Sequence, residues 1–249
     1  MHRKAITHLK RADPTLARVI ERVGVCRFTP RTEGTHFDAV ARSIVYQQLS
    51  GSAAHTIYTR WLSLYGGRAP SPLELLETPD ATLRGVGLSR QKIAYLKDLA
   101  HRSSAGDVPI DTLHELDDAE VIAALTRVKG VGRWTAQMFL MFRLGRPDVL
   151  PELDLGIRKG IQRAYGLRTL PSDARIRKLG RAWTPYCTIA SWYLWRLLDV
   201  DGVAGTPAAK RQGGTAKRAA RRSRDARTER RDRANGRSSG TRTARRNGG

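Results

Sequence analysis

Two helical runs joined by a four-residue turn constrain the fold of this chain more than any other feature. Residues 120–128 carry apolar side chains three and four positions apart, which predicts an amphipathic helix. The sequence Lys-Gly-Val-Gly follows at residues 129–132, and a second helical run begins near Arg133. Two glycines one residue apart let the backbone turn sharply and approach a partner closely. We therefore predict a helix-hairpin-helix unit over about residues 120–145.

The start of the second helix is suited to binding a phosphate oxygen. The first N–H groups of a helix have no partner within it, and the helix dipole places positive charge there. Lys129 and Arg133 add full charges on either side. Any glycine-containing turn between packed helices would look partly similar, so the turn alone leaves both interpretations open. A dinucleotide-binding loop does not fit, because no strand precedes Gly130 and Thr135 stands where its third glycine would be.

A strongly basic composition indicates a polyanionic partner. The 249 residues include 45 Lys and Arg against 23 Asp and Glu, a net charge of +22. Residues 205–249 supply +12 of this charge, which leaves +10 on residues 1–204. The C-terminal segment lacks aromatic residues, so we expect a domain at 1–204 followed by a disordered basic tail at 205–249. The tail could add phosphate contacts or could be a solvated segment without a specific role.

The remaining patterns indicate an all-α protein. Apolar residues recur at helical spacing between about residues 10 and 200, and alternating strand patterns are scarce. No apolar run approaches the roughly 20 residues of a membrane span, so we expect a cytoplasmic protein that does not bind membranes. Cys26 and Cys187 are the only cysteines, too few for a four-cysteine iron–sulfur or zinc site.

Several segments together resemble a known family. Residues 128–136, Val-Lys-Gly-Val-Gly-Arg-Trp-Thr-Ala, and the Pro- and Asp-containing loop at 147–154 resemble the helix-hairpin-helix/Gly-Pro-Asp (HhH-GPD) superfamily of DNA glycosylases. The resemblance is to its DNA-3-methyladenine glycosylase II (AlkA-like) type. Residues 44–54, 87–100 and 191–196 resemble further family segments in the same order. This resemblance implies two helical subdomains with a DNA-binding cleft between them.

The family resemblance implies a reaction and a catalytic group. A monofunctional glycosylase of base excision repair flips alkylated purines, such as 3-methyladenine and 7-methylguanine, out of DNA and hydrolyses them to leave an abasic site. Asp154 aligns with the family's catalytic aspartate, which would stabilise the oxocarbenium-like transition state. Helix capping by Asp154 is a compatible alternative. Glu152 is the nearest competing carboxylate, expected in a more solvated loop, and Leu153 replaces a second aspartate of some relatives.

The residue after Gly-Val-Gly-Arg predicts the reaction type. Bifunctional relatives have a lysine nucleophile there, whereas this chain has Trp134, so water is the expected nucleophile and no AP-lyase activity is expected. An aromatic pocket would stack on a cationic alkylated base. Packing in the core is the alternative for its tryptophans. The resemblance assigns to this base pocket Trp134, Trp195, Tyr46, Trp192 and Met138.

The resemblance also assigns contacts with DNA. Gln48 occupies the position at which relatives insert a side chain into the duplex, although a polar residue at a helix end is an alternative. Backbone carbonyls of Thr126, Val128 and Val131 are expected to hold a sodium or potassium ion that bridges to a phosphate. No organic cofactor and no iron–sulfur cluster are expected. The expected DNA-contacting residues are Gln48, Lys129, Gly130, Val131, Gly132, Arg133 and Thr135.

Two other functions remain open at this point. The chain could be a glycosylase for another lesion, such as hypoxanthine, uracil or oxidised guanine. It could instead be a catalytically silent helix-hairpin-helix protein that only binds DNA, although binding alone would not need Asp154. In each case double-stranded DNA, containing damaged bases for an enzyme, is the expected partner of a monomeric protein.

Overall fold

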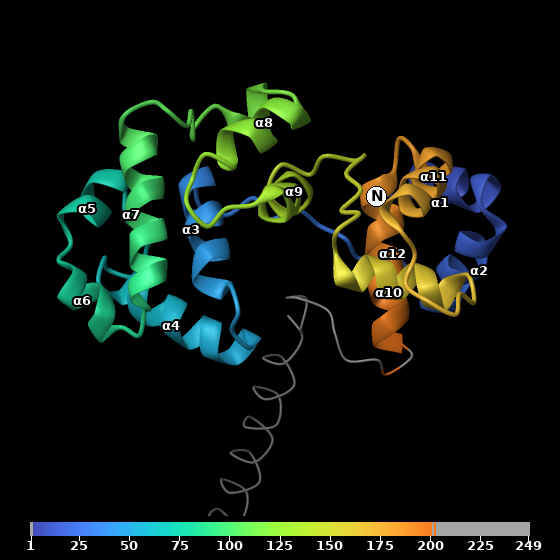
Figure 1. Ribbon diagram of the computed structural model, residues 1–249, viewed down its shortest axis with the longest axis horizontal. Coiled ribbons are helices and arrows are strands. Elements are labelled where there is room, and N and C mark those ends of the chain that lie inside the picture. Colours follow the sequence, from blue (N-terminus) through green and yellow to red (C-terminus); the bar gives the residue numbers. More distant parts are fainter. Residues whose placement is uncertain (1, 201, 203–249) are drawn as a thin grey trace, which may run out of the picture. The chain divides into compact units, whose positions relative to one another are not determined.

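The described part of the chain, residues 2–200 and 202 of a computed structural model, contains helices and loops but no strand (Figure 1). This confirms the all-α prediction. The segment 205–249, expected to be a disordered tail, lies outside the described residues. No described helix has the length and apolar character needed to cross a membrane. The α-helices are α1 (Arg3–Ala12), α2 (Pro14–Val23), α3 (His36–Tyr46), α4 (Gly51–Ser63), α5 (Pro72–Glu77), α6 (Asp80–Gly85), α7 (Arg90–Ser104), α8 (Asp118–Leu125), α9 (Arg133–Phe142), α10 (Leu155–Ala164), α11 (Asp173–Trp183) and α12 (Cys187–Val200).

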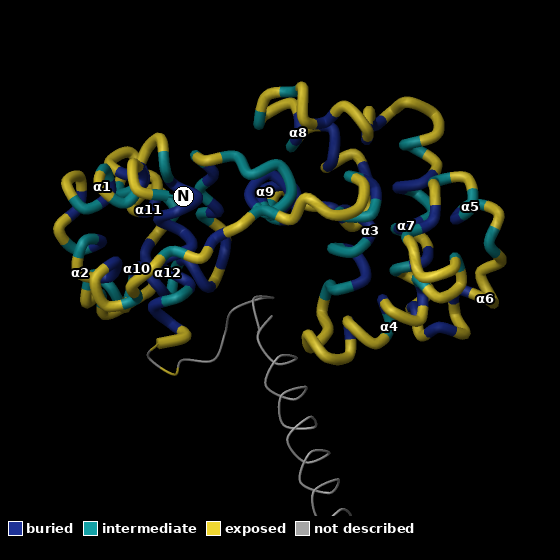
Figure 2. Tube along the Cα trace, turned by 180° about the vertical axis from the view of Figure 1, so that it is seen from behind, coloured by how far each residue is buried: buried dark blue, intermediate teal, exposed yellow. Residues whose placement is uncertain are grey.

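The helices form two groups, as the resemblance predicted. In one group α3 packs on α4, α7 and α9, and α7 also packs on α5 and α6. In the other, α12 packs on α10, α2 and α11, so the N-terminal helices lie beside the C-terminal ones (Figure 1). The Phe142 ring at the end of α9 stacks on Trp195 of α12, with centroids 5.9 Å apart. Most of the buried hydrophobic residues of both groups belong to one cluster, and buried residues are dark blue in Figure 2.

Local sequence explains where the predicted hairpin unit begins and ends. Asp117 and Glu120 form a capping box, in which each side chain accepts a hydrogen bond from the other residue's backbone N–H group. Helix α8 ends at Leu125, three residues earlier than predicted. The Arg127 and Val128 N–H groups bond to carbonyls three residues back, which tightens the last turn. Helix α9 begins at Arg133 as predicted.

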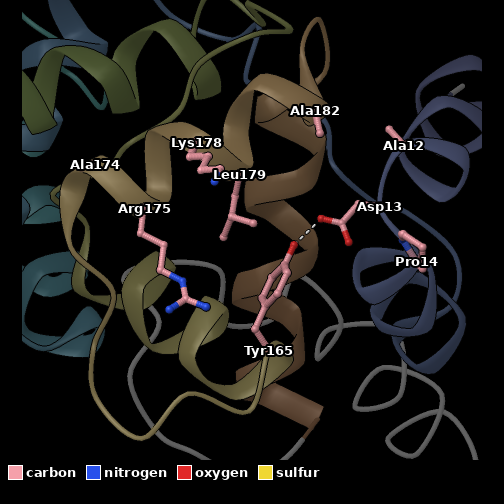
Figure 3. A pocket seen from close by; sticks show the side chains of 9 residues that line it. All are labelled: Ala12, Asp13, Pro14, Tyr165, Ala174, Arg175, Lys178, Leu179 and Ala182. Atoms are coloured by element: carbon pink, nitrogen blue, oxygen red, sulfur yellow. Dashed lines mark hydrogen bonds between the residues drawn. The ribbon is translucent and has the colours of Figure 1, made fainter.

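Asp13, in the turn between α1 and α2, ties three helices together. Its Oδ1 accepts hydrogen bonds from the Thr15 and Leu16 N–H groups at 2.9 and 3.0 Å, which caps α2. Its Oδ2 accepts from the Tyr165 hydroxyl, just after α10 (Figure 3). The same oxygen accepts from Trp183 Nε1 of α11 at 2.9 Å. Burial alone raises the pKa of Asp13, but these four hydrogen bonds outweigh burial and lower the pKa below its usual value.

Two glycines of α10 allow α12 to approach closely. A Cβ atom on Gly160 would lie 2.8 Å from the Leu194 carbonyl oxygen and 2.9 Å from its Cβ. Gly156, one turn earlier, faces the Trp195 indole in the same way, with 2.8 Å to its Nε1. The spacing of four residues places both glycines on one face of the helix. Small residues therefore set the distance between these two helices.

We predict that Gly160→Ala destabilises the protein by about 1–3 kcal/mol, because the added methyl meets backbone that cannot move aside freely. In an unobstructed helix the same exchange stabilises by about 1 kcal/mol. Gly85→Ala at the end of α6 is the control, since its Cβ would meet nothing within 4 Å. Urea unfolding measures both variants. Equal stability of Gly160→Ala and wild type would refute this account of the packing.

Asp13→Asn should change how stability depends on pH. The lowered pKa of Asp13 means that its stabilisation is present above the unfolded-state pKa of about 4 and is lost as pH falls through the folded-state pKa. Asparagine must also set its N–H groups either against the Trp183 donor or against the Thr15 and Leu16 N–H groups. We expect the variant to be about 1–3 kcal/mol less stable than wild type at pH 7, with a smaller difference at pH 3. Unfolding curves at both pH values test this, and a difference independent of pH would contradict it.

Candidate active site

Asp154 lies at the N-terminus of α10 and is almost fully buried, with 4% of its surface exposed. Its Oδ1 accepts a hydrogen bond from the Ile157 N–H group at 2.8 Å, so the side chain caps the helix. The capping expected from the sequence is therefore present. The N-terminal end of a helix dipole also favours a negative charge at this point.

Two tryptophans hold the same carboxylate. Trp134 Nε1, from α9, donates to Asp154 Oδ2 at 2.7 Å, and Trp195 Nε1, from α12, donates to Oδ1 at 2.9 Å. Helices α9, α10 and α12 thus converge on one side chain. N–H donors to an ionised carboxylate form strong, short hydrogen bonds. Within the described residues no cationic side chain forms an ion pair with Asp154, so its charge is not neutralised by a neighbour.

Gly156 makes this arrangement sterically possible. A Cβ atom there would lie 2.8 Å from Trp195 Nε1 and 2.9 Å from Asp154 Oδ1. Gly156 is absent from the residues that the sequence predicted for the site. A glycine in the first turn of a predicted helix was the available signal, because such a glycine weakens the helix unless close packing needs it.

The candidate pocket residues separate into two sets. Trp134 is half-buried and Trp195 is 3% exposed, and both contact Asp154. Met138 is half-buried and lies one turn after Trp134 on α9. Trp195 is also stacked on Phe142, so it combines packing in the core with its bond to the carboxylate. The structure therefore confirms that Trp195 packs in the core, while its place in a base pocket stays a prediction.

The other two aromatic candidates have different neighbours. Trp192 packs edge-on against Tyr193, with centroids 5.0 Å apart, and its ring lies 5.8 Å from the Arg196 guanidinium. Tyr46, the last residue of α3, lies under the Arg42 guanidinium at 4.5 Å. The described contacts do not join either ring to Asp154.

Glu152, the competing carboxylate, is held differently from Asp154. Its side chain is 14% exposed, so it is more exposed than Asp154 but less solvated than a free loop residue. Its Oε2 accepts from Gln137 Nε2 at 3.2 Å, and its Oε1 lies 3.8 Å from Arg133 Nε. Gln137 also donates to the Leu150 carbonyl at 3.1 Å, so it fixes the loop before Asp154. No sequence pattern indicated this role for Gln137.

The two hairpin glycines have different surroundings. Gly130 has φ +78°, and a Cβ there would lie 2.1 Å from the Tyr95 ring of α7. The hairpin therefore needs glycine at this position for its backbone conformation and its packing. Gly132 has an ordinary φ of −95°, and a Cβ there would meet nothing within 4 Å. Gly132 is thus not required by the protein's own packing.

The remaining hairpin candidates present both side chains and backbone. Lys129 and Arg133 are exposed, and the Lys129 N–H group donates to Asp98 Oδ2 at 2.8 Å. Val131 and Thr135 are buried at 4% and 7% exposure, so their side chains are not available for DNA. Gly132 caps α9 without a side-chain hydrogen bond, which leaves the first-turn N–H groups without a side-chain cap.

Gln48 has the backbone strain that often accompanies a functional position. It lies between α3 and α4, is exposed, and has φ +56°, the one positive φ at a non-glycine residue in the described part of the chain. The predicted insertion position is thus accessible.

Backbone carbonyls of the hairpin are suitable ligands for a monovalent cation. The Val128 carbonyl accepts the Val131 N–H group at 3.1 Å and keeps a second lone pair. Neutral oxygen ligands of this kind suit hard cations. In the residues that the structure describes, no group of three or more His, Cys, Asp or Glu side chains could hold a metal ion.

A shallow pocket elsewhere is separate from Asp154. It lies near the C-terminal end of α10, where Tyr165, Asp13 and Arg175 line it (Figure 3). Asp154 lies at the N-terminal end of the same helix, about 15 Å away at the rise of an α-helix.

Known proteins match this fold and these motifs. The chain is 34% identical over 196 residues to DNA-3-methyladenine glycosylase 1 of Schizosaccharomyces pombe, covering 78% of this chain and 86% of that protein. The structure of an S. pombe 3-methyladenine DNA glycosylase in complex with abasic DNA aligns with a TM-score of 0.70 and 33% identity, over 79% of this chain and 97% of the other. A DNA-3-methyladenine glycosidase from Bacillus halodurans aligns with a TM-score of 0.69 and 36% identity, over 77% and 88%.

The match to a family model agrees with these relatives. Residues 41–185 match the model described as HhH-GPD superfamily base excision DNA repair protein. This range contains the hairpin, Asp154 and Gln48, although not Trp195. The three relatives described above are named 3-methyladenine glycosylases or glycosidases, and the chain belongs to the HhH-GPD superfamily of base excision DNA repair proteins.

Proposed function

We propose that this protein is a monofunctional DNA glycosylase of the DNA-3-methyladenine glycosylase II type, which removes alkylated purines from double-stranded DNA. The observation that carries the proposal is the buried Asp154 carboxylate, fixed by two indoles and a helix N-terminus. The relatives named DNA-3-methyladenine glycosylases support the choice of substrate. We further propose that the protein acts as a cytoplasmic monomer.

The proposed chemistry uses the negative charge of Asp154. Cleavage of the C1′–N bond gives the sugar oxocarbenium character, and a nearby carboxylate lowers the energy of that cation. Asp154 suits this role because it lacks an ion-pair partner among the described residues, whereas Glu152 lies beside Arg133. Water then adds to C1′, and the products are a free base and an abasic site.

Two positions in the described part of the chain, Trp134 and Lys129, support a monofunctional reaction. Trp134 occupies the position of the lysine in bifunctional relatives, and its indole is committed to Asp154. The Lys129 ammonium lies 3.7 Å from Asp98 Oδ1, on the side of α7 rather than at Asp154. Neither residue is placed to form a Schiff base with the sugar.

The hairpin is the proposed phosphate-binding element. The N–H groups at the start of α9, together with the exposed Lys129 and Arg133, suit a DNA phosphate. The carbonyls of Thr126, Val128 and Val131 would hold a sodium or potassium ion there, which would add positive charge beside the phosphate. No organic cofactor and no iron–sulfur cluster belong to the proposed reaction.

Asp154→Asn should reduce release of 3-methyladenine and 7-methylguanine at least about a hundredfold, because the neutral amide cannot stabilise the cationic transition state. Base release from methylated duplex DNA under single-turnover conditions measures the effect. Wild type should release free bases without nicking the strand. Strand cleavage by wild type would contradict the monofunctional assignment, and undiminished release by Asp154→Asn would refute the role of Asp154.

Trp134→Phe and the double variant Trp134→Phe/Asp154→Asn distinguish a loss of catalysis from misfolding. In Asp154→Asn, either Trp134 or the pair Ile157 and Trp195 must face an N–H group instead of an oxygen. Trp134→Phe removes one donor, so the amide can be accommodated in the double variant. We expect Trp134→Phe to retain measurable base release and the double variant to lose it while unfolding at a similar temperature.

The substrate class is tested with wild type on a panel of damaged bases. Release of other damaged bases but not of methylated purines would identify a different substrate class.

Gly132→Ala should weaken DNA binding with little effect on folding. The methyl meets no protein atom within 4 Å, but it would project where a phosphate must approach the α9 N-terminus. We expect duplex affinity to fall by about tenfold and stability to change by less than about 1 kcal/mol. Fluorescence anisotropy and thermal unfolding test this, with Gly85→Ala as control. Unchanged affinity would exclude close phosphate contact at Gly132.

A further inference from the structure

The loop that carries Gln48 and the hairpin 129–132 are joined by one side chain. Gln47, immediately after α3, donates from Nε2 to the Gly130 carbonyl at 2.8 Å. These residues are 83 positions apart in the sequence. The bond therefore connects the two segments proposed to insert into the duplex and to bind its phosphates.

Helix α7 contacts both the hairpin and the end of α3 that leads into the Gln48 loop. Lys92 donates from Nζ to the Val45 carbonyl at 2.7 Å, just before Gln47, and burial lowers the pKa of this lysine. The Tyr95 ring packs against Gly130, and Asp98 Oδ2 accepts the Lys129 N–H group at 2.8 Å. These α7 residues follow one another at intervals of three positions, so one helix holds the end of α3 that leads into the Gln48 loop at one point and the hairpin at two.

Gln48 is under backbone strain between these attachments. Its φ of +56° is unfavourable for a residue with a side chain and persists only where the surroundings impose it. The preceding residue is held twice, by its N–H bond to the Ile44 carbonyl and by its side-chain bond to Gly130. Helix α4 begins at Gly51, which restricts the other side.

We propose that Gln47 is a positioning residue that couples the hairpin to Gln48, so that phosphate binding at the hairpin sets the position of the inserted side chain. Gln47 acts through Gln48 and not on the damaged base. The inference rests on the proposed glycosylase function. Its signature is non-additivity, because removing the link matters only while Gln48 has a side chain to position.

The test compares Gln47→Met, Gln48→Ala and the double variant. Methionine has a similar length but cannot donate to the Gly130 carbonyl. Base flipping is followed by the fluorescence of 2-aminopurine placed beside a methylated base, and excision by single-turnover base release. We expect Gln47→Met to lower excision and the fluorescence change about three- to tenfold, as the loss of one hydrogen bond implies. Affinity for undamaged duplex should stay within about twofold of wild type.

The remaining variants decide between coupling and a general defect. In the Gln48→Ala background, Gln47→Met should have no further effect, whereas the same loss in both backgrounds would overturn the proposal. Wild-type behaviour of Gln47→Met would also overturn it. Gln162→Met is the matched control, since Gln162 donates to the Arg168 carbonyl at 3.3 Å far from both loops. If wild type changes the fluorescence but releases no base, the proposed function fails while the coupling is still measured.

Discussion

The hydrogen bonds to the buried Asp154 carboxylate hold α9, α10 and α12 together. The carboxylate accepts N–H groups from α9, α10 and α12, so it fixes the relative positions of three helices that the chain reaches at separate points. A buried charge is costly unless its hydrogen bonds are satisfied. No cationic side chain among the described residues pairs with the carboxylate, so its negative charge would be available to a cationic transition state. Structural and proposed catalytic roles therefore coincide in one side chain.

Close packing around that carboxylate depends on residues without side chains. Gly156 admits the Trp195 indole, and Gly160 admits the α12 backbone one turn later. In the hairpin, Gly130 serves packing against Tyr95, whereas Gly132 leaves open space. The two glycines therefore differ in their surroundings, and only Gly132 has the open space that direct contact with a ligand would need.

Acidic residues have distinct positions in a chain with a net charge of +22. Asp13 joins α2 to α10 and α11, Asp98 fixes the hairpin backbone, and Asp117 caps α8. Asp13 and Asp117 accept hydrogen bonds where a helix begins, and Asp98 accepts one from the hairpin between α8 and α9. These three carboxylates therefore order helix ends and turns, and the side chains of Lys129 and Arg133 stay exposed at the hairpin beside Asp98 and Glu152.

The sequence by itself determined the helical class, the hairpin and the position of Asp154, because these depend on local signals: apolar periodicity, paired glycines and a motif of fixed spacing. It also placed Trp134 and Trp195 in the site through the family resemblance. Only the tertiary structure decided that Trp134 and Trp195 bind the carboxylate while Tyr46 and Trp192 have other neighbours. It alone showed the contacts of Gly156, Gln137 and Gln47. The physical reason is that these contacts join residues from different helices, and their geometry depends on how the helices pack rather than on spacing along the chain.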